Sequence, residues 1–374
     1  MKRRQLLLGG LPLALQPDWA TAAAVQAAEE PAWRMATAWR VASTSAPDTG
    51  DRVGVFRVDW AAGQLQIQAE QAVPSRAHGL LSLADGGFLA VAARPGRWLL
   101  RCDAQGDVMQ RWAMADDSPQ RSFDGHAQAS ADGAWIYTGE TDPATGAGWI
   151  SVRDARTLQR VAQFGSGGVD PHQLTVAGDG QLLVANGGIV RDVHGRKIAP
   201  ERMDSSLVRL DGRDGRLLGQ WRLPDARLSM RHLAWAQGPT ALLGIALQAE
   251  HDLPEQRAQA PVLALWDGQD LVLPSADNRG GGYAGDITAA PGGGFVLSAQ
   301  KQRMGLWWHP SRPAVLTRMA ELSEPCALMT CSDGDGVVLG AARGLARWHL
   351  HRPARLLSWP TPLGPDNHAV RLAA

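Results

Sequence analysis

Several features are scarce in this sequence, and each scarcity excludes a class of protein. Only three of the 374 residues are cysteines, Cys102, Cys326 and Cys331, which is too few for a disulfide-stabilised scaffold. Basic and acidic residues number 37 each, so no excess of positive charge is available to hold nucleic acid. Beyond the N-terminal segment, no apolar run reaches the roughly 18 residues that a membrane-spanning helix needs.

Familiar catalytic motifs are also missing. The sequence contains no Gly-x-Ser-x-Gly, no His-Glu-x-x-His and no Cys-x-x-Cys-His, so we expect no serine-hydrolase elbow, zinc-protease helix or covalent haem. The glycine runs open no predicted helix, which argues against a phosphate-binding loop. Cys326 and Cys331 are predicted to share one strand about 16 Å apart, on opposite faces, so they should not pair with each other.

The N-terminal segment has the order of a signal peptide. Lys2, Arg3 and Arg4 precede an apolar stretch of about ten residues and an alanine-rich tail. The arginine pair followed by Gln-Leu-Leu is similar to a twin-arginine export signal, which carries folded cargo. We therefore expect residues 1–27 to be removed and residues 28–374 to form a periplasmic protein without a transmembrane segment.

What the sequence does have is a repeat. Glycine (42) and tryptophan (15) are abundant, and they suit short strands joined by tight turns. Seven similar segments begin at residues 78, 126, 172, 232, 286, 326 and 368, which are 40 to 60 residues apart. Each has a short strand, a glycine-containing turn and a second strand. Repeats of about 40 to 50 residues with four strands each are typical of a β-propeller.

The two ends of the chain complete this count. The seventh segment stops after one strand, "HAVRLAA", while three further strands, "WRMATAWRV", "RVGVFRVDW" and "LQIQAEQAV", precede the first segment. A last blade built from both termini would leave no open sheet edge. The sequence thus predicts an all-β fold, a single seven-bladed propeller over residues 28–374 whose last blade is closed by N- and C-terminal strands.

The first residues of the repeats share one place in this architecture. The first strand of a blade is innermost, so its first residue should lie beside one mouth of the central channel. Half of the ten histidines occur at this phase, and the residues at all seven positions are of types that can bind a metal. The predicted ring consists of His78, His126, His172, His232, Asp286, Cys326 and His368.

Other polar residues are predicted at the same mouth. Second strands end there, and the chain places long insertions, residues 187–205 and 249–261, on that face, where ligand sites usually form. The candidate ligand-binding residues are Arg76, Arg94, Asp124, Glu140, Asn186, Arg231, Gln248, Gln300 and Arg343.

Three interpretations of the ring stay open on sequence alone. The histidines could be structural, hydrogen-bonding neighbouring blades or channel water. They could bind a transition metal, with iron, copper or zinc suiting these donors. They could instead hold a small anion or metal chelate together with Arg76, Arg94 and Arg231. Because imidazole must be neutral to coordinate, we expect metal binding to weaken below about pH 6.

Four segments carry a resemblance to a known family. The stretches "FDGHAQASADGAWIYTGETD", "GVDPHQLTVAGDGQLLVANGGI", "RMDSSLVRLD" and "LSMRHLAW" resemble exported bacterial propeller proteins catalogued as a domain of unknown function. Family members are typically encoded beside imelysin-type and di-haem oxidoreductase-like proteins. The resemblance implies a periplasmic role connected with iron or another metal, with iron-uptake proteins as partners. The chain departs from the family pattern after Ala-Asn-Gly-Gly-Ile, where "VRDVHGR" places His194.

These observations lead to one expected function and two alternatives. We expect a periplasmic propeller that binds a metal ion, metal complex or small polar ligand at one channel mouth and assists metal acquisition, with iron as the expected metal. One alternative is an oxidoreductase or lactonase-like hydrolase that uses a channel metal, with metal-bound water as nucleophile and Glu140 or Asp124 as base. The other is a protein-interaction scaffold with a purely structural ring.

Overall fold

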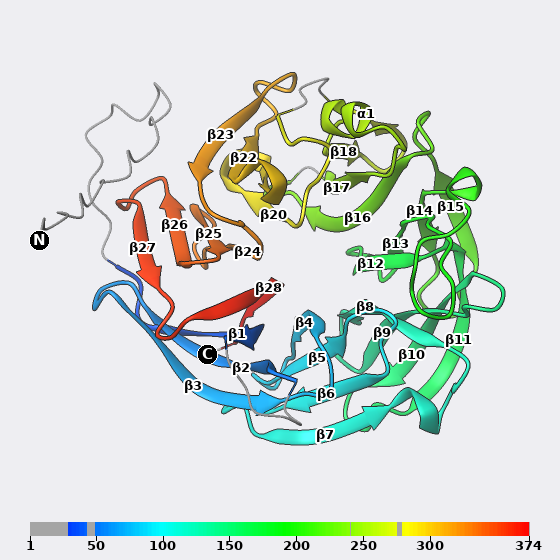
Figure 1. Cartoon of the computed structure of the whole chain (residues 1–374), viewed down its shortest axis with the longest axis horizontal. Helices are drawn as coiled ribbons and strands as arrows, with labels where there is room; N and C mark the ends of the chain where they lie inside the picture. The colour runs from blue at the N-terminus through cyan, green and yellow to red at the C-terminus, as the bar shows by residue number, and fades with distance from the viewer. Residues whose placement is uncertain (1–28, 43–48, 240, 275–278, 374) are drawn as a thin grey trace, which may run out of the picture.

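The chain forms a ring of seven four-stranded antiparallel sheets around a central axis (Figure 1). The computed structural model describes residues 29–42, 49–239, 241–274 and 279–373. The expected signal peptide, residues 1–27, lies outside the described residues. The predicted all-β, seven-bladed propeller is confirmed.

The blades follow one another around the ring in chain order. Blade 1 consists of β4 (Ala77–Ser82), β5 (Phe88–Ala92), β6 (Trp98–Cys102) and β7 (Val108–Ala113). Blade 2 consists of β8 (Ser122–Ala129), β9 (Trp135–Thr141), β10 (Ala147–Asp154) and β11 (Arg160–Val169). Blade 3 consists of β12 (Pro171–Val176), β13 (Leu182–Asn186), β14 (Ser206–Leu210) and β15 (Leu217–Trp221).

The second half of the ring is built in the same way. Blade 4 consists of β16 (Leu228–Trp235), β17 (Leu243–Ala249), β18 (Leu263–Trp266) and β19 (Leu271–Val272). Blade 5 consists of β20 (Ile287–Ala290), β21 (Gly294–Ala299), β22 (Met304–Trp308) and β23 (Leu316–Glu321). Blade 6 consists of β24 (Leu328–Thr330), β25 (Gly336–Ala341), β26 (Gly344–His349) and β27 (Arg355–Ser358). The helical segments are α1 (Pro254–Gln259) and the 3-10 turns η1 (Met114–Asp116), η2 (Pro200–Arg202), η3 (Pro291–Gly293) and η4 (Gln300–Gln302).

Blade 7 joins the two ends of the chain, as predicted. Its innermost strand is β28 (Leu363–Arg371), and it continues outward through β1 (Trp33–Val41), β2 (Asp51–Asp59) and β3 (Gln64–Ala72). Thr37 of β1 pairs with Ala369 of β28, and the Thr37 hydroxyl donates a hydrogen bond of 3.0 Å to the carbonyl of His368. This closure removes the open edge that an unclosed ring would expose.

Burial falls from the inner to the outer strands. Every residue of β5 and β13 is buried, whereas β3, at the rim, alternates between more and less exposed positions. The core lies between neighbouring blades; Val53 and Val55 of blade 7, for example, belong to one cluster with Phe88 and Ala90 of blade 1. The channel is therefore lined by the innermost strands, which are backed by this packed core (Figure 1). These strands are β4, β8, β12, β16, β20, β24 and β28.

Candidate metal centre and channel mouth

Four of the predicted ring histidines converge on one point in the channel. Ring nitrogens of His78, His126, His232 and His368 all lie within 4.8 Å of one another, and all four side chains are buried. These four residues are called the histidine cluster below. His172 lies beside it, with its Nε2 2.9 Å from Nε2 of His232.

A local irregularity of the inner strands turns these histidines into the channel. In blades 1 to 4 the pairing of the first two strands shifts register across the segments that contain His78, His126, His172 and His232. In blade 7, residues 366–368 lie opposite Ala38 alone. A β-bulge of this kind re-aims side chains, and bulges are common beside functional sites. Each of the five histidines therefore sits in a bulge.

Glycine allows two of these bulges to meet. Gly125 has a φ of +104°, and a Cβ at this position would lie 2.8 Å from Cδ2 of His78. A Cβ on Gly79 would lie 2.2 Å from the Gly125 carbonyl oxygen. The His-Gly pair of blade 1 and the Gly-His pair of blade 2 thus permit the close approach of His78 and His126, whose ring centroids are 4.8 Å apart.

Carboxylates orient two of the cluster rings. Nδ1 of His78 lies 3.4 Å from Asp366, and Nδ1 of His368 lies 3.5 Å from Asp286. A carboxylate at one ring nitrogen holds a histidine with its other nitrogen available as a ligand, which is the usual arrangement at metal sites. Asp286 thus stands behind His368, and its carboxylate also accepts backbone N–H groups of Ile287 and Leu328, each at 2.9 Å.

Several buried ring nitrogens in the cluster lack a partner. Nε2 of His126, Nδ1 of His232 and Nε2 of His368 have no hydrogen-bond partner among the described residues. An unsatisfied buried polar atom costs on the order of 1–3 kcal/mol. Three of them in one cluster indicate that something beyond the described residues completes it.

The cluster favours neutral imidazole. Burial lowers the pKa of His78 to about 4, although its hydrogen bond to Asp366 opposes the shift. Burial, together with the neighbouring histidines and Arg94, lowers the pKa of His126, His172 and His232 well below the usual value. Neutral imidazole is the form that coordinates a metal.

The size of the cluster fits a metal with a small contraction. Zinc–imidazole bonds of about 2.05 Å put the nitrogens of a tetrahedral site about 3.4 Å apart and opposite nitrogens of a square-planar site about 4.1 Å apart. No separation in the cluster exceeds 4.8 Å. Side-chain rotations that bring the rings together by about 1 Å would complete either geometry.

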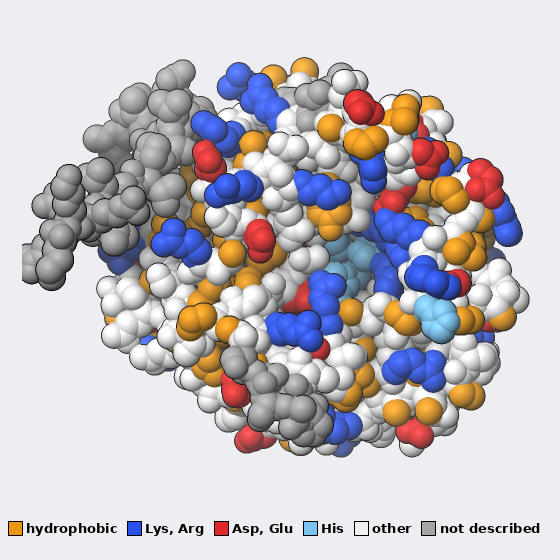
Figure 2. Space-filling view, viewed as in Figure 1, with side chains coloured by type: hydrophobic (Ala, Val, Ile, Leu, Met, Phe, Trp, Pro, Cys, Tyr) orange, Lys and Arg blue, Asp and Glu red, His pale blue; other side chains and the backbone are white. Residues whose placement is uncertain are grey.

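The cluster opens into a cavity of about 370 Å³, called the mouth cavity, whose lining includes His78, His172 and His232. In Figure 2, histidine side chains are visible at the centre of this face with Lys and Arg side chains around them. The lining has a single carboxylate, Glu250, among the described residues. Its seven cations are Arg76, Arg94, Arg191, Lys197, Arg231, Arg257 and Lys301.

One buried carboxylate organises three of these cations. Asp170 accepts hydrogen bonds from Arg94, from Arg191 at 3.4 Å and from Arg231 at 3.0 Å. Burial opposes ionisation of Asp170, but the charges of the arginines outweigh it and lower its pKa. Arg94 also contacts Nδ1 of His172, so this group connects the cavity wall to the ring.

Sequence reasoning missed Asp170 and Asp366, although a signal was present. Asp124, Asp170 and Asp366 all stand two residues before a ring histidine. In a bulged strand these positions stay close to the histidine, and Asp366 binds Arg76 at 2.5 Å as well as contacting His78. Of the three, only Asp124 is among the residues that the sequence predicts at the site.

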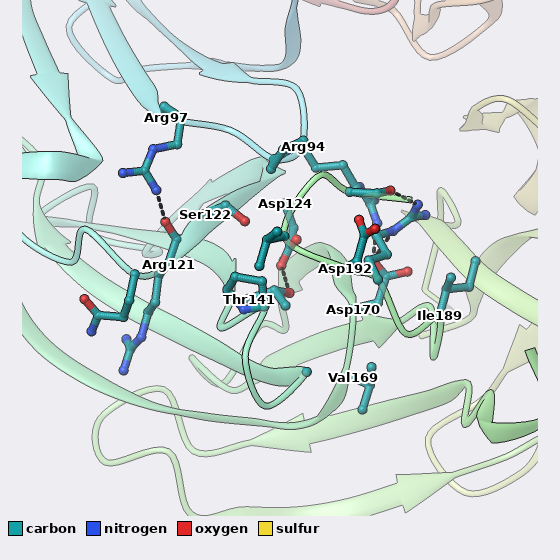
Figure 3. Close-up of a pocket in the computed structure, with 17 residues that line it drawn as sticks. Arg94, Arg97, Arg121, Ser122, Asp124, Thr141, Val169, Asp170, Ile189 and Asp192 are labelled. Atoms are coloured by element: carbon teal, nitrogen blue, oxygen red, sulfur yellow. Dashed lines mark hydrogen bonds and ion pairs between the residues drawn. The ribbon is translucent and has the colours of Figure 1, made fainter. Parts of the chain in front are cut away.

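A second cavity of about 290 Å³, the side cavity, adjoins the first between blades 1, 2 and 3 (Figure 3). Arg94 and Arg191 line both cavities. Asp124 faces the side cavity and accepts a 2.7 Å hydrogen bond from Thr141. Burial raises the pKa of Asp124 to about 7, with Arg94 opposing the shift.

The remaining predicted residues lie in different places. Gln248 lines the mouth cavity, and Gln300 donates a 2.9 Å hydrogen bond to Asn367 of its lining. Glu140 is fully buried and binds Arg153 at 2.8 Å, while Asn186 accepts a 2.9 Å bond from Ser166. Arg343 lines neither cavity among the described residues.

The three cysteines are free and buried, which confirms that Cys326 and Cys331 do not pair. Burial raises the pKa of the Cys326 thiol to about 12. The thiolate, which is the metal-binding form, is therefore disfavoured. Cys326 is not part of the histidine cluster.

Residues 71–372 match the family described as "Protein of unknown function (DUF1513)". The chain belongs to this family. The predicted resemblance to an exported propeller family of unknown function is thereby confirmed at the level of the family and its fold. No curated protein matches the sequence of this family member.

Solved structures show how widely its fold is shared. A protein from Lactobacillus plantarum is 14% identical, with a TM-score of 0.63, and the match covers 92% of this chain and 100% of that one. A periplasmic gluconolactonase from Pseudomonas aeruginosa is 13% identical, with a TM-score of 0.59 and coverage of 92% and 99%. Hydrazine synthase from Kuenenia stuttgartiensis is 13% identical, with a TM-score of 0.55 and coverage of 82% and 92%. At these identities the likeness concerns the fold alone.

Proposed function

We propose that this protein binds a transition-metal ion through His78, His126, His232 and His368. One observation carries the proposal: four buried imidazoles bring their ring nitrogens within 4.8 Å of one another, and three of them leave a buried nitrogen without a described partner. A ring that served only to join blades would be expected to satisfy its buried nitrogens within the protein. A metal would satisfy them.

The donor set narrows the choice of metal. Four neutral imidazoles suit zinc, copper or iron, and the buried Cys326 thiol adds no thiolate to the set. Asp366 and Asp286 would orient His78 and His368 toward the ion from behind. We propose that the protein binds this metal as part of metal acquisition, and iron is the metal to test first. We also propose that the protein acts after export to the periplasm. The signal-like N-terminus and the family resemblance support that part.

Elemental analysis of purified protein tests the metal site. Expressed with its own N-terminal segment and reloaded with iron, copper or zinc, the protein should carry close to one ion per chain. The double variant His126→Ala/His232→Ala should lose the ion while circular dichroism shows an intact β-propeller. The matched control His194→Ala/His351→Ala removes two exposed histidines and should keep it. Absence of metal from the reloaded native protein would overturn the proposal.

A hydrolytic activity is the second candidate, and Asp124 favours it. A carboxyl group with a pKa of about 7 suits a general base near neutral pH. Asp124 lines a cavity, whereas Glu140, the other predicted base, is bound to Arg153. Turnover of glucono-1,5-lactone by metal-loaded protein, lost in Asp124→Asn with metal content unchanged, would support this function. Equal rates for the variant and the native protein would exclude Asp124 as the base.

A further inference from the structure

The mouth cavity carries far more positive than negative charge. Its seven cations face the single lining carboxylate of Glu250. Asp170 and Asp366 neutralise part of this charge from behind, and the wall still holds four more positive than negative groups. Arg231 is among these cations and is paired with Asp170 at 3.0 Å.

This charge stands directly against the proposed metal site. His78 and His232 belong to the histidine cluster and also line the mouth cavity. Arg94 contacts Nδ1 of His172, and His172 is in turn 2.9 Å from His232. A metal ion reaching the cluster through the mouth cavity therefore passes a wall of arginine and lysine.

The two features make opposite demands on a bare metal ion. Imidazole lone pairs attract it, but a dication approaching the cationic wall is repelled, and the repulsion is strong where water is excluded. An anion that enters with the metal removes this conflict, because it brings the negative charge that the wall lacks.

We infer that the ligand of this site is a transition-metal ion in complex with a small hydroxy-polycarboxylate. Arginine side chains recognise carboxylates through paired hydrogen bonds, and several arginines around one cavity suit a molecule with several carboxylates. Gln248, Tyr283 and Asn367 add neutral hydrogen-bonding groups that suit a hydroxyl. A volume of about 370 Å³ lies at the small end of ligand sites. This inference rests on the proposed metal site and adds the chemical class of its cargo.

Two cations make the inference testable without disturbing the fold. Arg257 and Lys301 are exposed, and no described carboxylate lies within ion-pair distance of either. The Lys301 ammonium instead lies over the ring of Tyr283, 4.3 Å from its centroid. Arg76, Arg94, Arg191 and Arg231 are held by buried carboxylates, so removing them would disturb the protein itself.

Calorimetric titration of metal-free protein compares four probes: zinc chloride, sodium citrate, sodium phosphate and the zinc–citrate complex. We expect the complex to bind at least tenfold more tightly than zinc alone. The variant Arg257→Gln/Lys301→Gln should weaken binding of the complex about tenfold and leave zinc binding equal or slightly stronger. The control Arg156→Gln/Arg213→Gln removes two exposed charges from turns at the opposite ends of the strands and should change neither.

The outcomes separate this inference from the metal site itself. Zinc that binds equally well with and without citrate overturns the inference and leaves the metal site standing. If zinc and its complex both fail to bind while citrate binds, the metal site and the complex are both overturned. Phosphate that enhances zinc binding as strongly as citrate overturns the assignment to polycarboxylates. Tighter binding of the complex with no effect of Arg257→Gln/Lys301→Gln overturns the role of the cationic wall.

Discussion

Blades 5 and 6 differ from the other five blades at the one position that all seven repeats share. Where the five others carry a histidine, blades 5 and 6 carry Asp286 and Cys326, each shortly before the innermost strand of its blade, β20 or β24. Asp286 accepts backbone N–H groups of Ile287 and Leu328, so it links blade 5 to blade 6. The Cys326 backbone N–H donates to Gly340.

The difference assigns two roles to one repeat position. Asp286 and Cys326 are not part of the histidine cluster: Asp286 accepts backbone N–H groups and contacts Nδ1 of His368 from behind, and the Cys326 thiol is buried. In three of the histidine blades, a buried ring nitrogen of His126, His232 or His368 lacks a described partner. Unsatisfied buried polar atoms reduce stability, so three of them at one repeat position point to a ligand rather than to blade-to-blade contacts.

The largest effect on stability is expected from neutralising Asp170, the carboxylate that binds three arginines beside the ring histidines. Asp170→Asn leaves Arg94, Arg191 and the buried Arg231 without their shared counter-charge. We expect a loss of about 3–5 kcal/mol in the free energy of unfolding, measured by denaturant titration. Asp335→Asn in blade 6 removes a half-exposed carboxylate and should cost less than about 0.5 kcal/mol. Equal losses in the two variants would contradict the special place of Asp170.

Low pH should also destabilise the folded protein, through the buried ring histidine His78. The pKa of His78 falls from its ordinary value to about 4 on folding, so between about pH 6.5 and 4 the unfolded chain binds a proton that the folded chain does not. The free energy of unfolding should therefore decrease as pH falls through this window, by about 3 kcal/mol for His78 alone. Denaturant titrations at pH 7.5, 5.5 and 4.5 measure it. A His78→Gln variant with an unchanged slope would contradict this origin.

Metal binding should depend on pH through the same protonation of His78. The sequence alone predicts weaker binding below about pH 6, but burial moves the competing protonation of His78 toward pH 4. We therefore expect metal to remain bound at pH 5.5 and to be released near pH 4. Metal content after equilibrium dialysis at both values measures it, and release already at pH 6 would show that the cluster histidines are not shielded from protons.

Distortion at the bulge can be tested by glycine substitution. Gly125→Ala places a methyl group at a φ of +104° and 2.8 Å from Cδ2 of His78, and it should cost about 1–3 kcal/mol and weaken metal binding. The matched change Gly340→Ala beside Cys326 meets its nearest atom at 3.4 Å and should cost less than about 1 kcal/mol. Thermal unfolding and metal content of both variants measure the contrast. Loss of metal from Gly340→Ala as well would contradict the expected contrast between the two variants.

The sequence predicts the features that follow from the spacing of the repeats. It predicts few of the features that depend on which residues face each other across two paired strands. It places the ring positions, the seven blades and the closing strand β28, because short strands and glycine turns recur at fixed intervals. It does not predict the bulges, since these depend on which residues face each other across two strands. Asp170 was missed for the same reason. Glu140 was placed at the mouth by its position in the repeat, but it shares a strand face with Thr138 and meets Arg153 of the next strand.

The smallest effect on metal content is expected at Cys326. This ring position has a side chain of a strong ligand type, but its surroundings disfavour the ionised thiol. Cysteine is a strong metal ligand only as thiolate, and burial raises the pKa of Cys326 to about 12. Cys326→Ala should therefore leave metal content unchanged and cost about 1 kcal/mol for the lost packing of its side chain. Elemental analysis and denaturant titration of the metal-loaded variant measure both. Loss of the ion would place Cys326 among the ligands and make blade 6 part of the site, because a coordinated thiolate would have overcome the burial that now disfavours it.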